Sequence, residues 1–135
     1  MTAQLLGIDW LPAPRPWPEL SRAAELLLIA PAADEAFFRA FLITAIERAG
    51  GSASAALLAS AVAYSIYQVP LRDVLLLSEQ ASLPLLLYQL LGLFLGGLYQ
   101  RSGGSLPLVV VCHATFNGLV TALRAAQVGS SLPFL

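Results

Sequence analysis

Four long apolar segments run along the chain, separated by short polar or glycine-containing breaks. With approximate bounds, they cover residues 20–48, 52–69, 82–100 and 106–126. A helix needs about 20 apolar residues to cross ~30 Å of hydrocarbon. The last two segments have this length, the second nearly does, and the first does once its charged residues are shielded from lipid. The pattern therefore predicts about four membrane-spanning segments.

These segments are predicted to be helices. Inside a bilayer every backbone N–H and C=O needs a partner within the protein, and a helix supplies that partner within one segment. Gly92 and Gly96 form a GxxxG pattern on the third segment, which lets a neighbouring helix approach closely. The expected fold class is all-α, an integral membrane bundle of about four transmembrane helices.

Composition supports the membrane assignment. The chain is 58% hydrophobic and 11% charged, with a mean hydropathy of +0.76, whereas a soluble domain carries roughly 25% charged and about 45–50% apolar residues. A net charge of −1 gives no basic surface for nucleic acid. The single cysteine, Cys112, excludes an intrachain disulfide and argues against a cysteine-based metal site.

Three parts are predicted along the chain. Alternating prolines and two tryptophans mark residues 1–20 as an irregular N-terminal arm, because proline does not fit a helix interior. The tryptophans suit the headgroup level of a bilayer. Residues 21–127 form the helical membrane domain, and residues 128–135 form a C-terminal tail.

A charged cluster interrupts the first segment. Asp34, Glu35 and Arg39 lie well inside it, where each charge costs roughly 2.5–3.5 kcal/mol on insertion scales. Glu35 and Arg39 are spaced i, i+4 with the acid first, the favourable order for an ion pair on one helix face. Arg39 therefore neutralises one carboxylate and leaves the other over. An ionisable side chain inside a membrane segment indicates a functional site.

Two further polar pairs share this helical spacing. His113 and Asn117 lie one turn apart on the fourth segment, and Tyr64 and Gln68 lie one turn apart on the second. Three helices with one polar stripe each predict a shared interior site. A carboxylate and a histidine beside a small wet cavity are suited to activate water, and an asparagine amide is suited to stabilise a developing oxyanion.

Taken singly, the same residues have simpler interpretations. The charged cluster also fits a buried structural ion pair, or a first segment that lies at the membrane interface. His113 fits a hydrogen-bonded interior histidine, and Asn117 fits a helix-packing contact. Tyr64 fits a packing aromatic, and Gln68 fits a hydrogen bond at the helix end before Pro70. Alternating helices also place Gln68 near a membrane face, away from the acids and His113, so helix tilt is needed to join them.

The order of these motifs resembles the CAAX prenyl protease 2 type of intramembrane protease, also called the CPBP or ABI family. The family pattern is EExxxR on one helix, FxxxH on the next and HxxxN or HxxxD on a late helix. The resemblance covers roughly residues 25–126. Asp34-Glu35-Ala-Phe-Phe-Arg39 is similar to the first motif, Tyr64-Ser-Ile-Tyr-Gln68 falls where the second belongs, and His113-Ala-Thr-Phe-Asn117 matches the third in full.

The resemblance implies an all-helical membrane fold and an endopeptidase activity. In the family, a motif-one glutamate activates water, two histidines are its partners and the asparagine supports the oxyanion. Eukaryotic members remove the last three residues of prenylated CAAX proteins. The implied partners are membrane lipid and a peptide or protein substrate in the membrane, which is a bacterial inner membrane or a plastid membrane. The residues carried over are Asp34 or Glu35 as water activator, Arg39 as its electrostatic partner, His113 as acid–base or polarising group, Asn117 as oxyanion donor and Gln68 at the motif-two position.

This chain departs from the family pattern at two positions. Asp34 replaces the first glutamate, which shortens the side chain by one methylene, and a misplacement of about 1 Å is enough to cost activity. Gln68 replaces the motif-two histidine, and glutamine can hold a water but cannot exchange a proton near neutral pH. If the reaction uses a divalent metal such as zinc, its expected ligands are Glu35 and His113, one nitrogen short of the usual catalytic set.

Three functions fit these observations. The first is an intramembrane endopeptidase in which a carboxylate activates water. The second, motivated by Gln68, is a catalytically inactive relative that acts as a membrane binding or scaffold protein. The third is a helical transport component in which Asp34 or Glu35 carries protons.

Overall fold

The computed structural model describes residues 20–75 and 79–131, and every secondary-structure element in these two ranges is a helix. This confirms the all-α fold class. Residues 1–19 of the predicted arm and residues 132–135 of the predicted tail lie outside the described ranges. The elements are α1 (Leu20–Ala24), η2 (Glu25–Ile29), α2 (Ala30–Glu35), η3 (Ala36–Ile43), α3 (Thr44–Arg48), α4 (Ala53–Gln68), α5 (Leu71–Leu75), α6 (Glu79–Arg101) and α7 (Leu106–Ser131).

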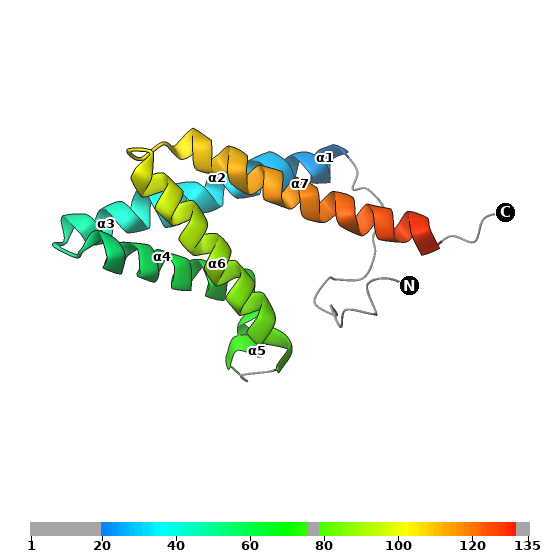
Figure 1. Cartoon of the computed structure of the whole chain (residues 1–135), viewed down its shortest axis with the longest axis horizontal. Coiled ribbons are helices and arrows are strands. Elements are labelled where there is room, and N and C mark those ends of the chain that lie inside the picture. The colour runs from blue at the N-terminus through cyan, green and yellow to red at the C-terminus, as the bar shows by residue number, and fades with distance from the viewer. Residues whose placement is uncertain (1–19, 76–78, 132–135) are drawn as a thin grey trace.

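The first five elements join end to end into one rod over residues 20–48, which we call the first rod (Figure 1). Two of its parts, η2 and η3, are π-helical and flank α2, the element that carries the two adjacent acids. Such turns are rare and often occur at functional sites. The rod is therefore irregular on both sides of its charged residues.

A tight turn reverses the chain between the first rod and α4. Gly50 has a φ of +90°, a backbone conformation that favours glycine after a helix. Ser52 then caps α4, because its hydroxyl accepts a 3.2 Å hydrogen bond from the backbone N–H of Ala55. Local sequence thus explains why α4 runs back along the rod.

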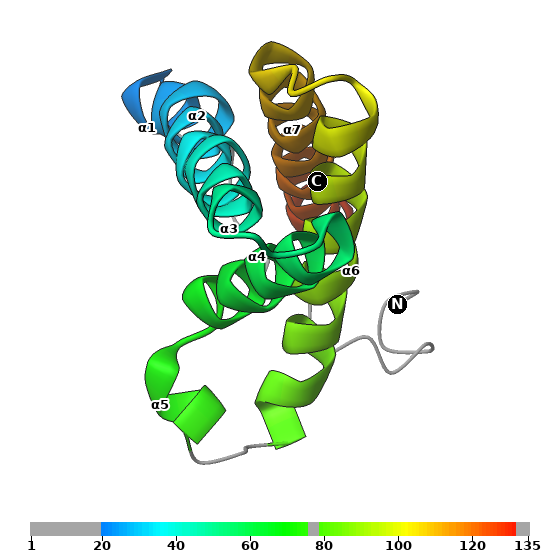
Figure 2. The same cartoon turned by 90° about the vertical axis from the view of Figure 1, so that its left-hand side faces the viewer.

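The predicted close helix contact forms between α4 and α6 (Figure 2). A Cβ built on Gly92 would lie 3.0 Å from Ala61 Cα, and one built on Gly96 would lie 2.5 Å from Leu57 Cδ1. At Gly92 the neighbour is backbone, so a side chain there would push the helices apart, whereas at Gly96 it is the end of a leucine side chain. The GxxxG prediction is confirmed.

Gly92→Ala is expected to lower the free energy of unfolding by about 1–3 kcal/mol, because the added methyl group overpacks against the α4 backbone. Gly97→Ala is the matched control on the same helix, since a Cβ there meets nothing within 4 Å. That variant is expected to gain up to about 1 kcal/mol from helix propensity. Thermal unfolding in detergent micelles compares the two, and equal stabilities would contradict the close contact.

Large apolar side chains face outward in this fold, and two charged side chains of the first rod face inward. Phe41, Leu58 and Phe94 are each at least half exposed. Glu35 and Arg39, in contrast, are completely buried. A soluble protein has the opposite arrangement, whereas lipid chains satisfy an apolar exterior. The distribution of side chains therefore fits a membrane environment.

Two helices are long and apolar enough to cross a membrane, Ala81–Arg101 within α6 and Leu106–Leu123 within α7. Within the described ranges, α4 has 16 residues and the first rod carries the charged cluster, so neither passes the same test. The predicted number of four spans is thus not established.

The last helix is longer than its hydrophobic pattern suggested. The fourth apolar segment was expected to end near residue 126, yet α7 continues to Ser131. Residues 128–131, assigned to the tail, are helical. The nearest proline after the segment is Pro133, so no proline stops the helix earlier.

Candidate active site

Glu35 lies at the centre of a buried group of side chains that joins three helices. Its Oε1 lies 2.8 Å from Nδ1 of His113 on α7, and its Oε2 lies 3.0 Å from Nε of Arg39 one turn along the rod. All three side chains are buried. With Tyr64 they form what we call the buried cluster. Both oxygens of Glu35 are therefore engaged inside the protein.

Arg39 is held by more than its ion pair. Its Nη2 donates a long hydrogen bond of 3.5 Å to the Gly92 carbonyl, and its Cζ lies 4.5 Å from the centre of the Tyr64 ring, a cation–π distance. Its contact with Glu35 is an ion pair without hydrogen-bond geometry, since neither Glu35 Oε2 nor Arg39 Nε, nor the second nitrogen Nη1, has a hydrogen-bond partner among the described residues. The i, i+4 pair predicted between Glu35 and Arg39 is confirmed, and the close approach at Gly92 brings the α6 backbone to it.

Tyr64 completes the surroundings of His113. Its hydroxyl lies 3.3 Å from His113 Nε2, and the two rings pack edge to face at 5.8 Å. A carboxylate can only accept, so Nδ1 of a neutral His113 carries the proton toward Glu35, and Nε2 accepts from Tyr64. The sequence favoured packing as the role of Tyr64. The signal for its polar contact was its position one turn before Gln68 on the same face.

A second, more open pair lies beside the buried cluster. Gln68 Nε2 donates a 3.0 Å hydrogen bond to Asp34 Oδ2, and both side chains are only partly buried. The expected gap between these residues was wrong. Asp34 lies 14 residues before the rod ends at Arg48, and Gln68 lies 16 residues after Ser52, so antiparallel helices of equal rise bring them to one level.

Asn117 makes its contact away from these pairs. Its Nδ2 donates a 3.0 Å hydrogen bond to the backbone carbonyl of Leu26 in η2. The structure thus brings five of the six predicted site residues into two neighbouring groups, and ties the sixth to the first rod one turn further along α7. Asp34 and Glu35 point to different partners although they are adjacent in sequence.

The side chains of the site do not form a good metal centre. In the described ranges, no group of three or more His, Cys, Asp or Glu side chains is placed to hold an ion. Glu35 and His113, the expected ligands, bind each other, and the guanidinium of Arg39 occupies the second carboxylate oxygen. A cation at Glu35 would face this positive charge. No step is assigned to a metal.

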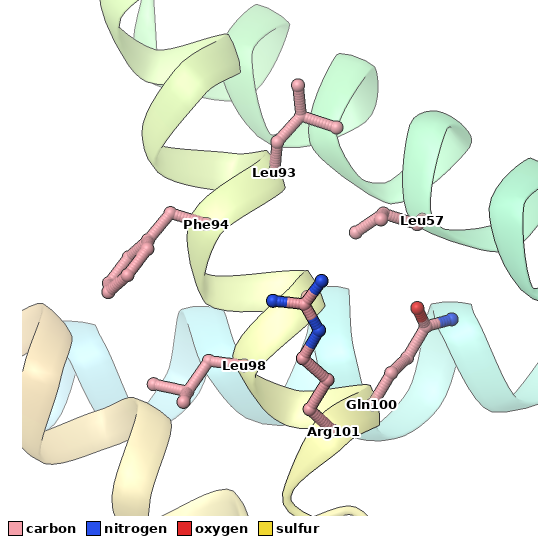
Figure 3. A pocket seen from close by; sticks show the side chains of 7 residues that line it. Leu57, Leu93, Phe94, Leu98, Gln100 and Arg101 are labelled. Carbon is pink, nitrogen blue, oxygen red and sulfur yellow. The ribbon is translucent and has the colours of Figure 1, made fainter.

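An open hollow of about 330 Å³ lies elsewhere, between α4 and α6 (Figure 3). Arg101 and Gln100 stand at its polar end, and its other lining residues are apolar or glycine. None of them belongs to the buried cluster or to the pair of Asp34 and Gln68. The hollow therefore does not lead to the candidate site.

Comparison with known proteins places the chain in a family. The family model described as type II CAAX prenyl endopeptidase Rce1-like matches residues 16–119. No curated protein and no solved structure matches the chain. The matched range contains all six predicted site residues and both helices that are long enough to cross a membrane, apart from the last turn of the second. The chain therefore belongs to the Rce1-like family of type II CAAX prenyl endopeptidases, a family of membrane proteases.

Proposed function

We propose that this protein is an intramembrane endopeptidase in which Asp34 activates the attacking water. The observation that carries the choice of Asp34 is the contrast between the two adjacent acids. Both oxygens of Glu35 are engaged by Arg39 and His113 in a closed interior. Asp34 is half-buried, and only its Oδ2 has a partner among the described residues. A general base must reach the proton that it removes.

Gln68 orients this base and helps to hold the water. Its Nε2 fixes Asp34 Oδ2, while its Oε1 has no hydrogen-bond partner among the described residues and is available to accept from a water. Asp34 takes a proton from the water while the water oxygen bonds to the scissile carbonyl carbon. The proton then passes to the amine as the C–N bond breaks. Gln68 needs no change of charge in this sequence.

Glu35, Arg39 and His113 form the frame behind the base. Glu35 fixes Nδ1 of His113, so a proton can be exchanged only at Nε2, which faces Tyr64. Arg39 supplies a positive charge next to the two acids and lowers the cost of holding them in the interior. The proposed substrate is a peptide or protein segment in the membrane, and the proposed membrane is a bacterial inner membrane or a plastid membrane.

A catalytically inactive membrane binding or scaffold protein is the second candidate. Two observations favour it: Gln68 stands where the family pattern has a histidine, and both ring nitrogens of His113 already have partners. Such a protein would keep the buried contacts of Glu35, Arg39 and His113 but would not cleave peptides.

Proteolysis in liposomes tests the proposal. Purified protein is offered a peptide library that includes prenylated CAAX peptides, with and without a chelator. Cleavage is expected for the parent, and its loss in His113→Ala but not in Thr115→Ala is the expected pattern. Thr115 is the control because it is exposed on the same helix, and its hydroxyl donates to the backbone carbonyl of Val111 one turn earlier. No cleavage by the parent, with activity gained in Gln68→His, would establish the inactive relative instead.

A further inference from the structure

Pro31 leaves the first rod without one hydrogen-bond donor, just after the π-helical turn η2 and before the two acids. The N–H of Ala30 donates to the carbonyl of Glu25, five residues back, which is the π-helical register. The next bond in that register would run from residue 31 to the carbonyl of Leu26. Proline has no N–H, so the Leu26 carbonyl has no donor from this position of its own helix.

Asn117 supplies the missing donor from another helix. Its Nδ2 lies 3.0 Å from the Leu26 oxygen, across 91 positions of sequence. The helices are close here, since a Cβ on Gly118 would lie 3.7 Å from Leu27 Cδ2. The bond lies at the outer face of the helix pair. Where that face meets hydrocarbon, an unpaired carbonyl costs free energy, because no water can take the place of the lost N–H. The contact therefore compensates for Pro31.

This contact also fixes the geometry of the site. His113, one turn before Asn117 on α7, bonds to Glu35, nine residues after Leu26 on the rod. Two hydrogen bonds between the same two helices fix both their relative rotation and their axial position, whereas with one bond the helices could still rotate about it. The second bond holds the π-helical turn that precedes the acids.

We infer that Asn117 is a positioning residue, whose amide replaces the N–H that Pro31 lacks and so fixes the acid-bearing rod against α7. This differs from the oxyanion donor expected from the sequence, because the Asn117 amide is directed to a backbone carbonyl. The effect on turnover rests on the proposed peptidase activity. The effect on stability does not.

A double-mutant cycle tests the inference. In the parent background Asn117→Ala is expected to lower the midpoint of thermal unfolding by about 5 °C, and to lower turnover with it. In Pro31→Ala the new N–H can bond to Leu26, so adding Asn117→Ala there is expected to cost less than half as much in both readouts. Equal losses in the two backgrounds would overturn the inference and favour a direct contact with substrate.

Two further variants make the test independent of how Pro31→Ala folds. Asn117→Leu keeps the approximate size of the side chain but has no donor, so it is expected to lose stability as Asn117→Ala does. Thr121→Val is the control, because among the described residues the Thr121 hydroxyl bonds to the backbone carbonyl of Asn117 within the same helix, and its unfolding midpoint is expected to stay near that of the parent. An Asn117→Leu variant as stable as the parent would overturn the inference. If the parent shows no turnover, the unfolding midpoints alone decide it.

Discussion

Turnover is expected to fall by about 10²–10⁴-fold when Asp34 is replaced by Asn, the range that a positioned general base contributes. The substitution keeps the size of the side chain. Its amide oxygen can still accept the hydrogen bond from Gln68 Nε2, so the local contact survives. What disappears is the group that removes a proton from water. Initial rates of peptide cleavage in liposomes measure the effect.

The matched control for this variant is Glu25→Gln. Glu25 is another acid of the first rod, exposed and nine residues earlier, and its neutralisation is expected to leave the rate unchanged. Asp34→Glu is expected to retain activity, because it keeps the carboxylate and restores the glutamate of the family motif. An unchanged rate for Asp34→Asn in a folded protein would assign the base to another group.

The free energy of unfolding is expected to fall by about 3–5 kcal/mol in Glu35→Gln, the usual cost of removing one partner from a buried ion pair. Arg39 is completely buried and has Glu35 as its anionic partner, at 3.0 Å. Gln preserves the volume but leaves the guanidinium charge uncompensated in the interior. The same change weakens the contact with Nδ1 of His113. Thermal or denaturant unfolding in detergent measures the loss.

Two comparisons separate charge from packing in this experiment. Glu47→Gln, an exposed acid of the same rod bonded to Gln100, is expected to change stability by no more than about 1 kcal/mol. Combining Glu35→Gln with Arg39→Met removes both charges, and part of the lost stability is expected to return. If Glu35→Gln unfolds like the parent, the buried guanidinium of Arg39 does not need the charge of Glu35.

Together these two predictions assign different roles to the neighbouring carboxylates. Glu35 stabilises the interior and orients His113, while Asp34, on the more open side, has an oxygen available for water. The two effects are expected in different measurements, since one variant loses rate with little change in stability and the other loses stability first.

Local periodicity was enough to predict much of this protein. The apolar segments gave the helices, because a chain in lipid must pair its backbone within each segment. The i, i+4 spacing of Glu35 and Arg39 predicted their ion pair, because residues one turn apart share a helix face. Counting residues from the turn at Gly50 also places Gln68 at the same height as Asp34. The expected gap came from measuring from the start of the first segment, but the first rod is longer than one span.

Only the tertiary structure decided which acid meets which partner. Adjacent residues on a helix point about 100° apart, so the rotation of the rod against α4 and α7 sends Glu35 to His113 and Asp34 to Gln68. The hydroxyl contact of Tyr64 with His113 likewise joins positions 49 apart in sequence. Such contacts depend on how whole helices pack side by side, and the periodicity of a single helix carries no information about its rotation relative to its neighbours.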